Sequence, residues 1–120
     1  MADQRREPRK KLMAFTPIYA LNPRVLLGYL ADLTVRGAMV MGERSVEVDK
    51  HLNLAIDFPT ELTWIVPKPF TMSARVVRCH QDESPRYFNI GLEFTNVELE
   101  QEAILKMIIN RYQFQREIPI

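Results

Sequence analysis

Turn-forming residues interrupt this 120-residue chain about every ten residues between Leu12 and Phe94, so its apolar residues fall into short segments. The segment Leu52–Phe58 alternates apolar and polar side chains, as a strand with one buried face does. Short strands at this spacing predict a small antiparallel β-barrel or sandwich, and closing the sheet into a barrel removes exposed edges. The predicted strands are Met13–Leu21, Val25–Leu33, Ala38–Met41, Leu52–Phe58, Phe70–His80 and Tyr87–Phe94.

The C-terminal part of the chain has a helical pattern instead. Thr95 and Glu98 have the spacing of a capping box, and no Gly or Pro follows until after Gln115. This predicts one amphipathic helix at about residues 97–115. Residues 103–109 are apolar around more of the helix than one barrel surface buries, which predicts a homodimer or a protein partner through this helix. In the proline-rich loop 59–69, Trp64 is expected to pack as a plug, with a partner anchor as the alternative.

The length and the charge distribution limit the classes of protein to which this chain can belong. A chain of 120 residues with 47% hydrophobic residues makes one globular domain. Residues 1–11 carry five basic and two acidic residues, whereas the remaining chain has eleven basic and thirteen acidic residues. We therefore expect a flexible basic arm at 1–11 and a barrel with its helix at 12–120. A slightly acidic body does not favour DNA or RNA as a partner, and no apolar stretch is long enough for membrane insertion.

The sequence offers no catalytic or metal-binding pattern. Cys79 and His80 are neighbours on a predicted strand and so point to opposite faces. His51 and His80 lack the ligand spacing of a metal site. The single cysteine fits a reducing compartment, so we expect a cytoplasmic protein that is not an enzyme and holds no metal or cofactor.

Two short motifs and two strands occur in a distinctive order. An R-x-x-x-R pattern at Arg5 and Arg9 is followed by a D-x-T-x-x-G pattern at Asp32, Thr34 and Gly37, and then by the segments 73–78 and 89–94. This series resembles the PilZ domain, the bacterial receptor module for cyclic di-GMP, over nearly the whole chain. The resemblance implies a six-stranded antiparallel barrel, of split or Greek-key type, with a C-terminal helix.

The resemblance also implies a ligand site. Arg5 and Arg9 would wrap the nucleotide from the arm, and Asp32, Thr34 and Gly37 would form the floor. Further candidates are Arg6, Lys10 and Arg36. Serine is commoner in the family at the position of Thr34, which keeps the hydroxyl and adds a methyl group.

The chemistry of the ligand agrees with these residue types. Guanine presents paired acceptors that an arginine fork fits, and the two phosphates favour the same cation. A carboxylate such as that of Asp32 accepts from the N–H donors on guanine's other edge. Considered alone, the segment 32–37 is also ordinary turn chemistry, and the two roles are compatible.

The function implied by the resemblance is a second-messenger receptor that passes the signal to a partner protein controlling motility, biofilm formation or exopolysaccharide synthesis. One alternative is an adaptor of the same fold that does not bind the nucleotide, which a titration with cyclic di-GMP distinguishes. A second alternative is a small nucleic-acid-binding barrel, which would show a much steeper dependence on salt.

Overall fold

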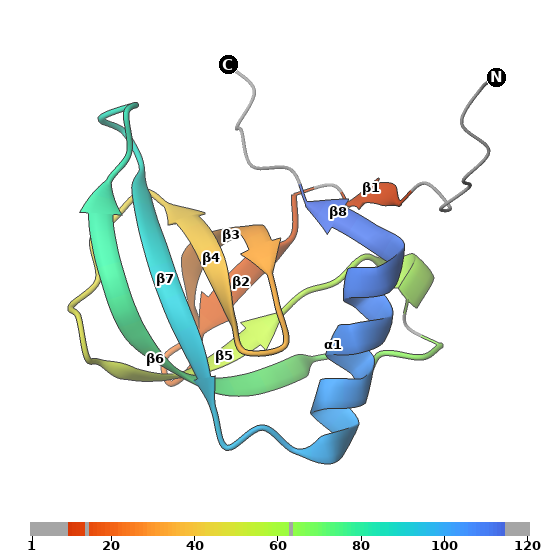
Figure 1. Cartoon of the computed structure of the whole chain (residues 1–120). Coiled ribbons are helices and arrows are strands. Elements are labelled where there is room, and N and C mark those ends of the chain that lie inside the picture. The colour runs from red at the N-terminus through yellow and green to blue at the C-terminus, as the bar shows by residue number, and fades with distance from the viewer. Residues whose placement is uncertain (1–9, 14, 63, 115–120) are drawn as a thin grey trace, which may run out of the picture.

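Six antiparallel strands form a closed barrel in the structure, a computed structural model that describes residues 10–13, 15–62 and 64–114 (Figure 1). Around the barrel the strands follow the order β2-β3-β4-β7-β6-β5. Because β7 returns to lie beside β4 after the consecutive neighbours β5 and β6, the connection is of Greek-key type. The predicted barrel is confirmed. Its strands are β2 (Pro17–Ala20), β3 (Val25–Leu33), β4 (Gly37–Gly42), β5 (His51–Ile56), β6 (Phe70–Gln81) and β7 (Phe88–Thr95).

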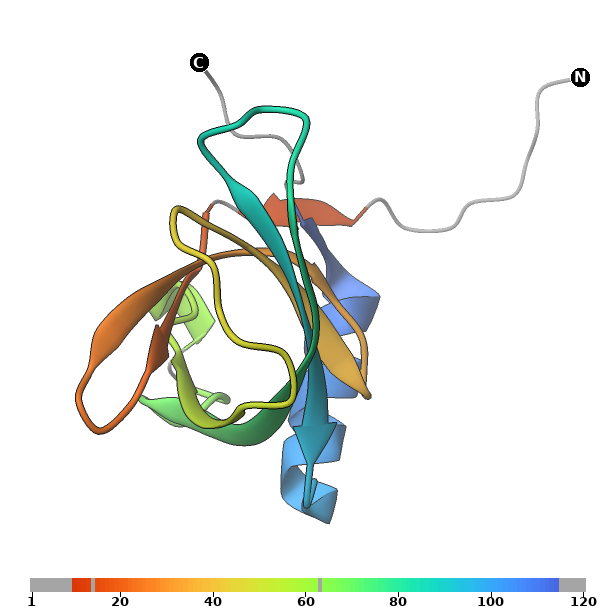
Figure 2. The same cartoon turned by 90° about the vertical axis from the view of Figure 1, so that its left-hand side faces the viewer.

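The two ends of the barrel are covered by different elements. Residues 43–50, between β4 and β5, cross one mouth (Figure 2). The helix α1 (Leu99–Arg111) lies at the other end (Figure 1). Leu105 and Ile108 of α1 belong to the same buried cluster as barrel residues such as Val40 and Leu54, and the short 3-10 helix η1 (Thr60–Leu62) adds Leu62. The helix therefore completes the core of the barrel.

The first predicted strand, Met13–Leu21, is two strands in the structure. Only β2 joins the barrel, whereas β1 (Lys11–Met13) pairs in parallel with β8 (Tyr112–Phe114) in a separate two-stranded sheet. The predicted end of the helix near Gln115 is wrong for the same reason. Tyr112 adopts an extended backbone conformation and pairs with β1, so that α1 ends at Arg111.

The helix also begins later than predicted, and with a different cap. Thr95 is the last residue of β7, and Asn96 has a positive φ of 53° that turns the chain away from the sheet. The capping box is formed by Glu98 and Gln101, with the backbone N–H of Glu98 donating to Oε1 of Gln101 at 2.8 Å. The predicted box of Thr95 and Glu98 is therefore wrong by three residues.

Much of the apolar surface of the helix is used within the chain. Leu105 and Ile108 are buried, and Ile104, Met107 and Ile109 are half-buried against the core. This reduces the surface available for a homodimer through residues 103–109, which stays a prediction. Trp64 is 76% exposed, so the plug expected for the 59–69 loop is wrong. Of the helices among the described residues, none has the length and apolar character to span a membrane.

Candidate functional site

The turn between β3 and β4 is built by the hydroxyl of Thr34. Its Oγ1 accepts hydrogen bonds from the backbone N–H groups of Arg36 and Gly37, both at 3.1 Å, and donates to the carbonyl oxygen of Gly37 at 3.4 Å. The backbone N–H of Thr34 also donates to that carbonyl at 2.9 Å. The turn chemistry expected for this segment is therefore present, and it fixes the backbone between the two strands.

Gly37 allows β4 to approach β7 closely. It pairs with Glu93, and a Cβ atom at position 37 would lie 2.1 Å from the carbonyl oxygen of Leu92. A side chain at this position would therefore push the two strands apart. The glycine of the D-x-T-x-x-G pattern thus serves the packing of the barrel wall beside the turn.

Asp32 stands at an irregularity of the β3–β4 pairing. The register shifts between Leu30 and Asp32, and Asp32 is half-buried. Its Oδ1 accepts a hydrogen bond from the backbone N–H of Leu33 at 2.9 Å. This bond holds the carboxylate close to the end of β3.

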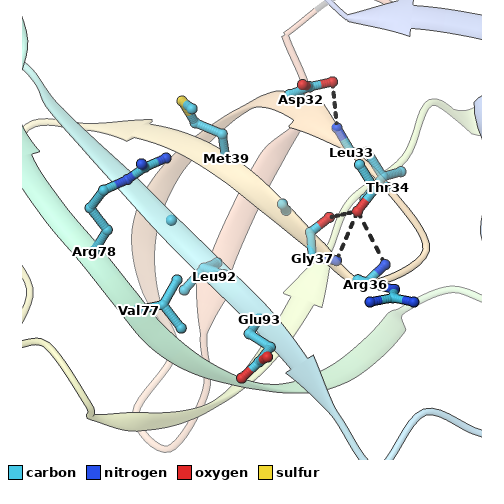
Figure 3. Close-up of a pocket in the computed structure, with 12 residues that line it drawn as sticks. Asp32, Leu33, Thr34, Arg36, Gly37, Met39, Val77, Arg78, Leu92 and Glu93 are labelled. Atoms are coloured by element: carbon cyan, nitrogen blue, oxygen red, sulfur yellow. Dashed lines mark hydrogen bonds between the residues drawn. The ribbon is translucent and has the colours of Figure 1, made fainter.

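Asp32, Thr34 and Gly37 line one pocket of about 300 Å³ on the barrel wall (Figure 3). The sequence motif is therefore assembled in space, and Arg36 lines the same pocket. Lys10 is exposed just before β1 and does not line it. Arg5, Arg6 and Arg9 lie outside the described residues. The full lining is Asp32, Leu33, Thr34, Arg36, Gly37, Ala38, Met39, Val77, Arg78, Gly91, Leu92 and Glu93.

Arg78 is a residue of this pocket to which sequence reasoning gave no binding role. The β6–β7 register shifts between Val76 and Arg78, so that Arg78 pairs with Gly91. A Cβ atom at Gly91 would meet Cβ and Nε of Arg78 at 3.5 and 3.6 Å, which shows that the arginine side chain lies over the glycine. In Figure 3, Arg78 lies on the side of the pocket away from Thr34. The sequence carries no signal for this role, because the pairing of Arg78 with Gly91 depends on the register of two strands.

The charges around the pocket are unequally paired. Arg75, on β6, donates to Glu93 at 3.1 Å and to Asp49 at 2.7 Å, and the hydrogen bond to Glu93 is the main reason why the pKa of Arg75 is raised. The carboxylate of Glu93 at the pocket edge is thereby compensated. The side chains of Arg36 and Arg78 form no ion pair with any described residue. Two arginines are thus available to an anionic ligand on this wall.

Among all the residues that the structure describes, no cluster of His, Cys, Asp or Glu side chains could hold a metal ion. The polar side chains of the pocket are two carboxylates, of which that of Glu93 is paired with Arg75, one hydroxyl and two guanidinium groups. Such a set recognises a ligand that carries both anionic oxygens and N–H donors, because arginine binds the oxygens and the carboxylate binds the donors.

Comparison with known proteins gives a family and a fold. The model of the PilZ domain matches residues 3–111. The structure of the Bacillus subtilis inhibitor of motility, MotI/DgrA, superposes with a TM-score of 0.61 at 18% identity, over 82% of this chain and 46% of that one. The chain thus spans less than half of that protein. The PilZ domain with c-di-GMP of YcgR from Escherichia coli superposes with a TM-score of 0.54 at 17% identity, over 91% of this chain and 92% of that one. No curated protein sequence matches.

Proposed function

The chain belongs to the PilZ domain family, and from this membership we propose that it is a receptor for cyclic di-GMP. PilZ domains are binding and adaptor domains rather than enzymes. The observation that carries the proposal is the pocket on the barrel wall, where Asp32, Thr34 and Gly37 of the family motif meet two arginines without ion-pair partners among the described residues.

The proposed contacts follow from the chemistry of each group. Asp32 accepts hydrogen bonds from the N–H edge of one guanine, and Arg78 and Arg36 face phosphate or guanine acceptors. Arg5 and Arg9 complete the site from the arm, by the family motif that they match. Thr34 acts through the turn, because its oxygen already accepts two backbone N–H bonds.

The step after binding is an altered surface offered to a protein partner. The arm arginines immediately precede β1, and ligand binding would fix their position relative to the barrel. A partner that recognises the arm in this fixed position would then bind only when the ligand is bound. One solved relative of the fold is an inhibitor of motility, and we propose motility, biofilm formation or exopolysaccharide synthesis as the process controlled, in the cytoplasm.

Calorimetry with cyclic di-GMP tests the proposal, with GTP and GMP as controls for linear guanine nucleotides. We expect selective binding of the cyclic ligand with a dissociation constant below about 100 μM, which corresponds to at least ~5.5 kcal/mol. Asp32→Ala should weaken binding, whereas Asp82→Ala in the β6–β7 hairpin should leave it unchanged. No heat from cyclic di-GMP at about 100 μM would indicate an adaptor of this fold that does not bind the nucleotide.

A further inference from the structure

A second hollow lies on the barrel wall, separate from the site described above. It has a volume of about 710 Å³ and shares no lining residue with the first pocket. We propose that it binds a small amphipathic organic anion, with an apolar ring-bearing body and a single anionic group. Its lining is Phe15, Val25, Leu26, Leu27, Gly28, Tyr29, Met41, Gly42, Glu43, Arg44 and Tyr87.

The wall of the hollow is largely apolar and aromatic. Phe15 and Tyr29 meet edge to face, with their ring centroids 5.9 Å apart, and Tyr29 pairs with Met41 across β3 and β4. Val25 and Leu26 are each 45% exposed. Rings and a thioether favour a planar apolar body, and covering this exposed surface would remove it from water.

Two of the lining residues are glycines that let β3 and β4 approach each other closely at the hollow. A Cβ atom at Gly28 would lie 2.3 Å from the carbonyl oxygen of Met41, and one at Gly42 would lie 2.3 Å from that of Leu27. Gly28 also has a φ of 157° and lies opposite Ile18, where the β2–β3 register shifts. A side chain at either position would therefore push the two strands apart at the edge of the hollow. The volume of the hollow is in the usual range for small-molecule sites.

The polar end of the hollow carries one available cation. The guanidinium of Arg44 has no ion pair or hydrogen bond with any other described residue. The neighbouring carboxylate of Glu43 also has no ion pair with any described residue. Arg44, Val25, Leu26 and Leu27 also line a hollow at the barrel mouth, so the arginine stands where the two spaces meet. Arginine binds a carboxylate or sulfonate with two hydrogen bonds, while the neighbouring Glu43 opposes a second negative charge.

Fluorescence titration with anilinonaphthalene sulfonate, an aromatic anion of this class, tests the proposal. Phenylnaphthylamine serves as the uncharged comparison. We expect saturable binding of one sulfonate probe per chain. Arg44→Gln should weaken the anionic probe about five- to tenfold and leave the neutral probe unchanged, because only the anion uses the guanidinium. Tyr29→Ala should weaken both probes, since it removes part of the apolar wall.

Arg111→Gln, at the exposed end of α1, is the matched control and should change neither probe. Equal weakening by Arg44→Gln and Arg111→Gln would mean that only net charge attracts the anion, and the proposal would fall. Non-saturable fluorescence would overturn it too. Displacement of the probe by cyclic di-GMP would assign the hollow to the nucleotide site, whereas unchanged probe binding in a protein saturated with the nucleotide supports a separate site. The probe titrations of the parent protein and its variants do not depend on whether the protein binds cyclic di-GMP.

Discussion

The hydroxyl of Thr34 is occupied within the turn that it builds. An oxygen of this kind has two acceptor sites, and the N–H groups of Arg36 and Gly37 take both. The serine that is commoner in the family offers the same oxygen without the methyl group. A hydroxyl is therefore needed at this position to hold the pocket edge, and the methyl group is an addition to an exposed side chain.

Substitutions at Thr34 test this role. We expect Thr34→Ser to bind cyclic di-GMP within about twofold of the parent, because the two N–H bonds remain. Thr34→Val keeps the shape but removes the oxygen, and should weaken binding about tenfold as the turn loses its bonds. Calorimetry measures both, and circular dichroism verifies that the variants are folded. Equal affinity of the valine and serine variants would show that the hydrogen bonds of Thr34 in the turn do not contribute to binding.

Arg9 and Arg6 provide a matched comparison on the basic arm. Either substitution by alanine removes one positive charge, but the family motif assigns a bidentate contact to Arg9 and Arg5 only. Loss of that contact should cost ~1–3 kcal/mol, so Arg9→Ala should bind about fivefold to more than a hundredfold more weakly than Arg6→Ala. Arg9→Lys should restore little, since lysine lacks the fork. If calorimetry gave equal losses at the two positions, charge alone would account for the role of the arm.

Among the elements, the short parallel pair of β1 and β8 connects the arm to the end of α1. Met13 and Tyr112 are buried, whereas Leu12 is exposed, so the pair is held to the body along one side. Residues 5–9 immediately precede this pair in the sequence. A ligand that fixes the arm should therefore steady β1, and through it β8.

Hydrogen exchange measures this coupling. With saturating cyclic di-GMP, we expect slower exchange of the amides in β1 and in Tyr112–Phe114 of β8, because a fixed arm reduces fraying of the pair. The hairpin at 82–86 is remote in sequence from the arm and should exchange at the same rate with and without ligand. Slowing confined to residues 32–37, with β8 unaffected, would show that the ligand acts on the pocket alone.

The barrel strands could be predicted from the sequence because their signals are local. The segment Leu52–Phe58 alternates along its length, and Val25–Leu33 has the same bounds in the structure. The pairing of β1 with β8 has no such signal, since each strand has only three residues and their partners are distant in sequence. The predicted helix boundaries are wrong because Asn96 turns the chain with a positive φ before the helix and Tyr112 pairs with β1 after it.

The candidate site was predictable to the same extent. The D-x-T-x-x-G pattern lies within six consecutive residues, and its three marked members do line one pocket. Arg78 joins them only because the β6 register shifts by one residue before it, and that shift depends on the pairing with β7. Sequence alone identified the contiguous part of the site and could not identify the part formed across strands.

At the scale of the whole molecule, the two proposed ligand sites lie on one barrel wall. Met39 lines the pocket proposed for the nucleotide, and Met41, two residues further along β4, lines the apolar hollow. Residues two apart on a strand point to the same side of the sheet. The two spaces are therefore neighbours on the outer face of β4, with different chemistry: arginines and carboxylates in one, and mainly aromatic and aliphatic side chains in the other.

The pairing of Lys11 with Tyr112 also determines when the parts of the protein can assemble as it is made. These residues are about one hundred positions apart, so β1 leaves the ribosome long before its partner strand exists. The barrel strands pair over shorter separations in the sequence. The barrel can therefore close while β1 is still unpaired. The basic arm is thus synthesised before the barrel, but the strand pair to which it is attached forms only after all the barrel strands have been made. A nascent chain that already has a closed barrel would therefore bind the nucleotide at full strength only after Phe114 has emerged.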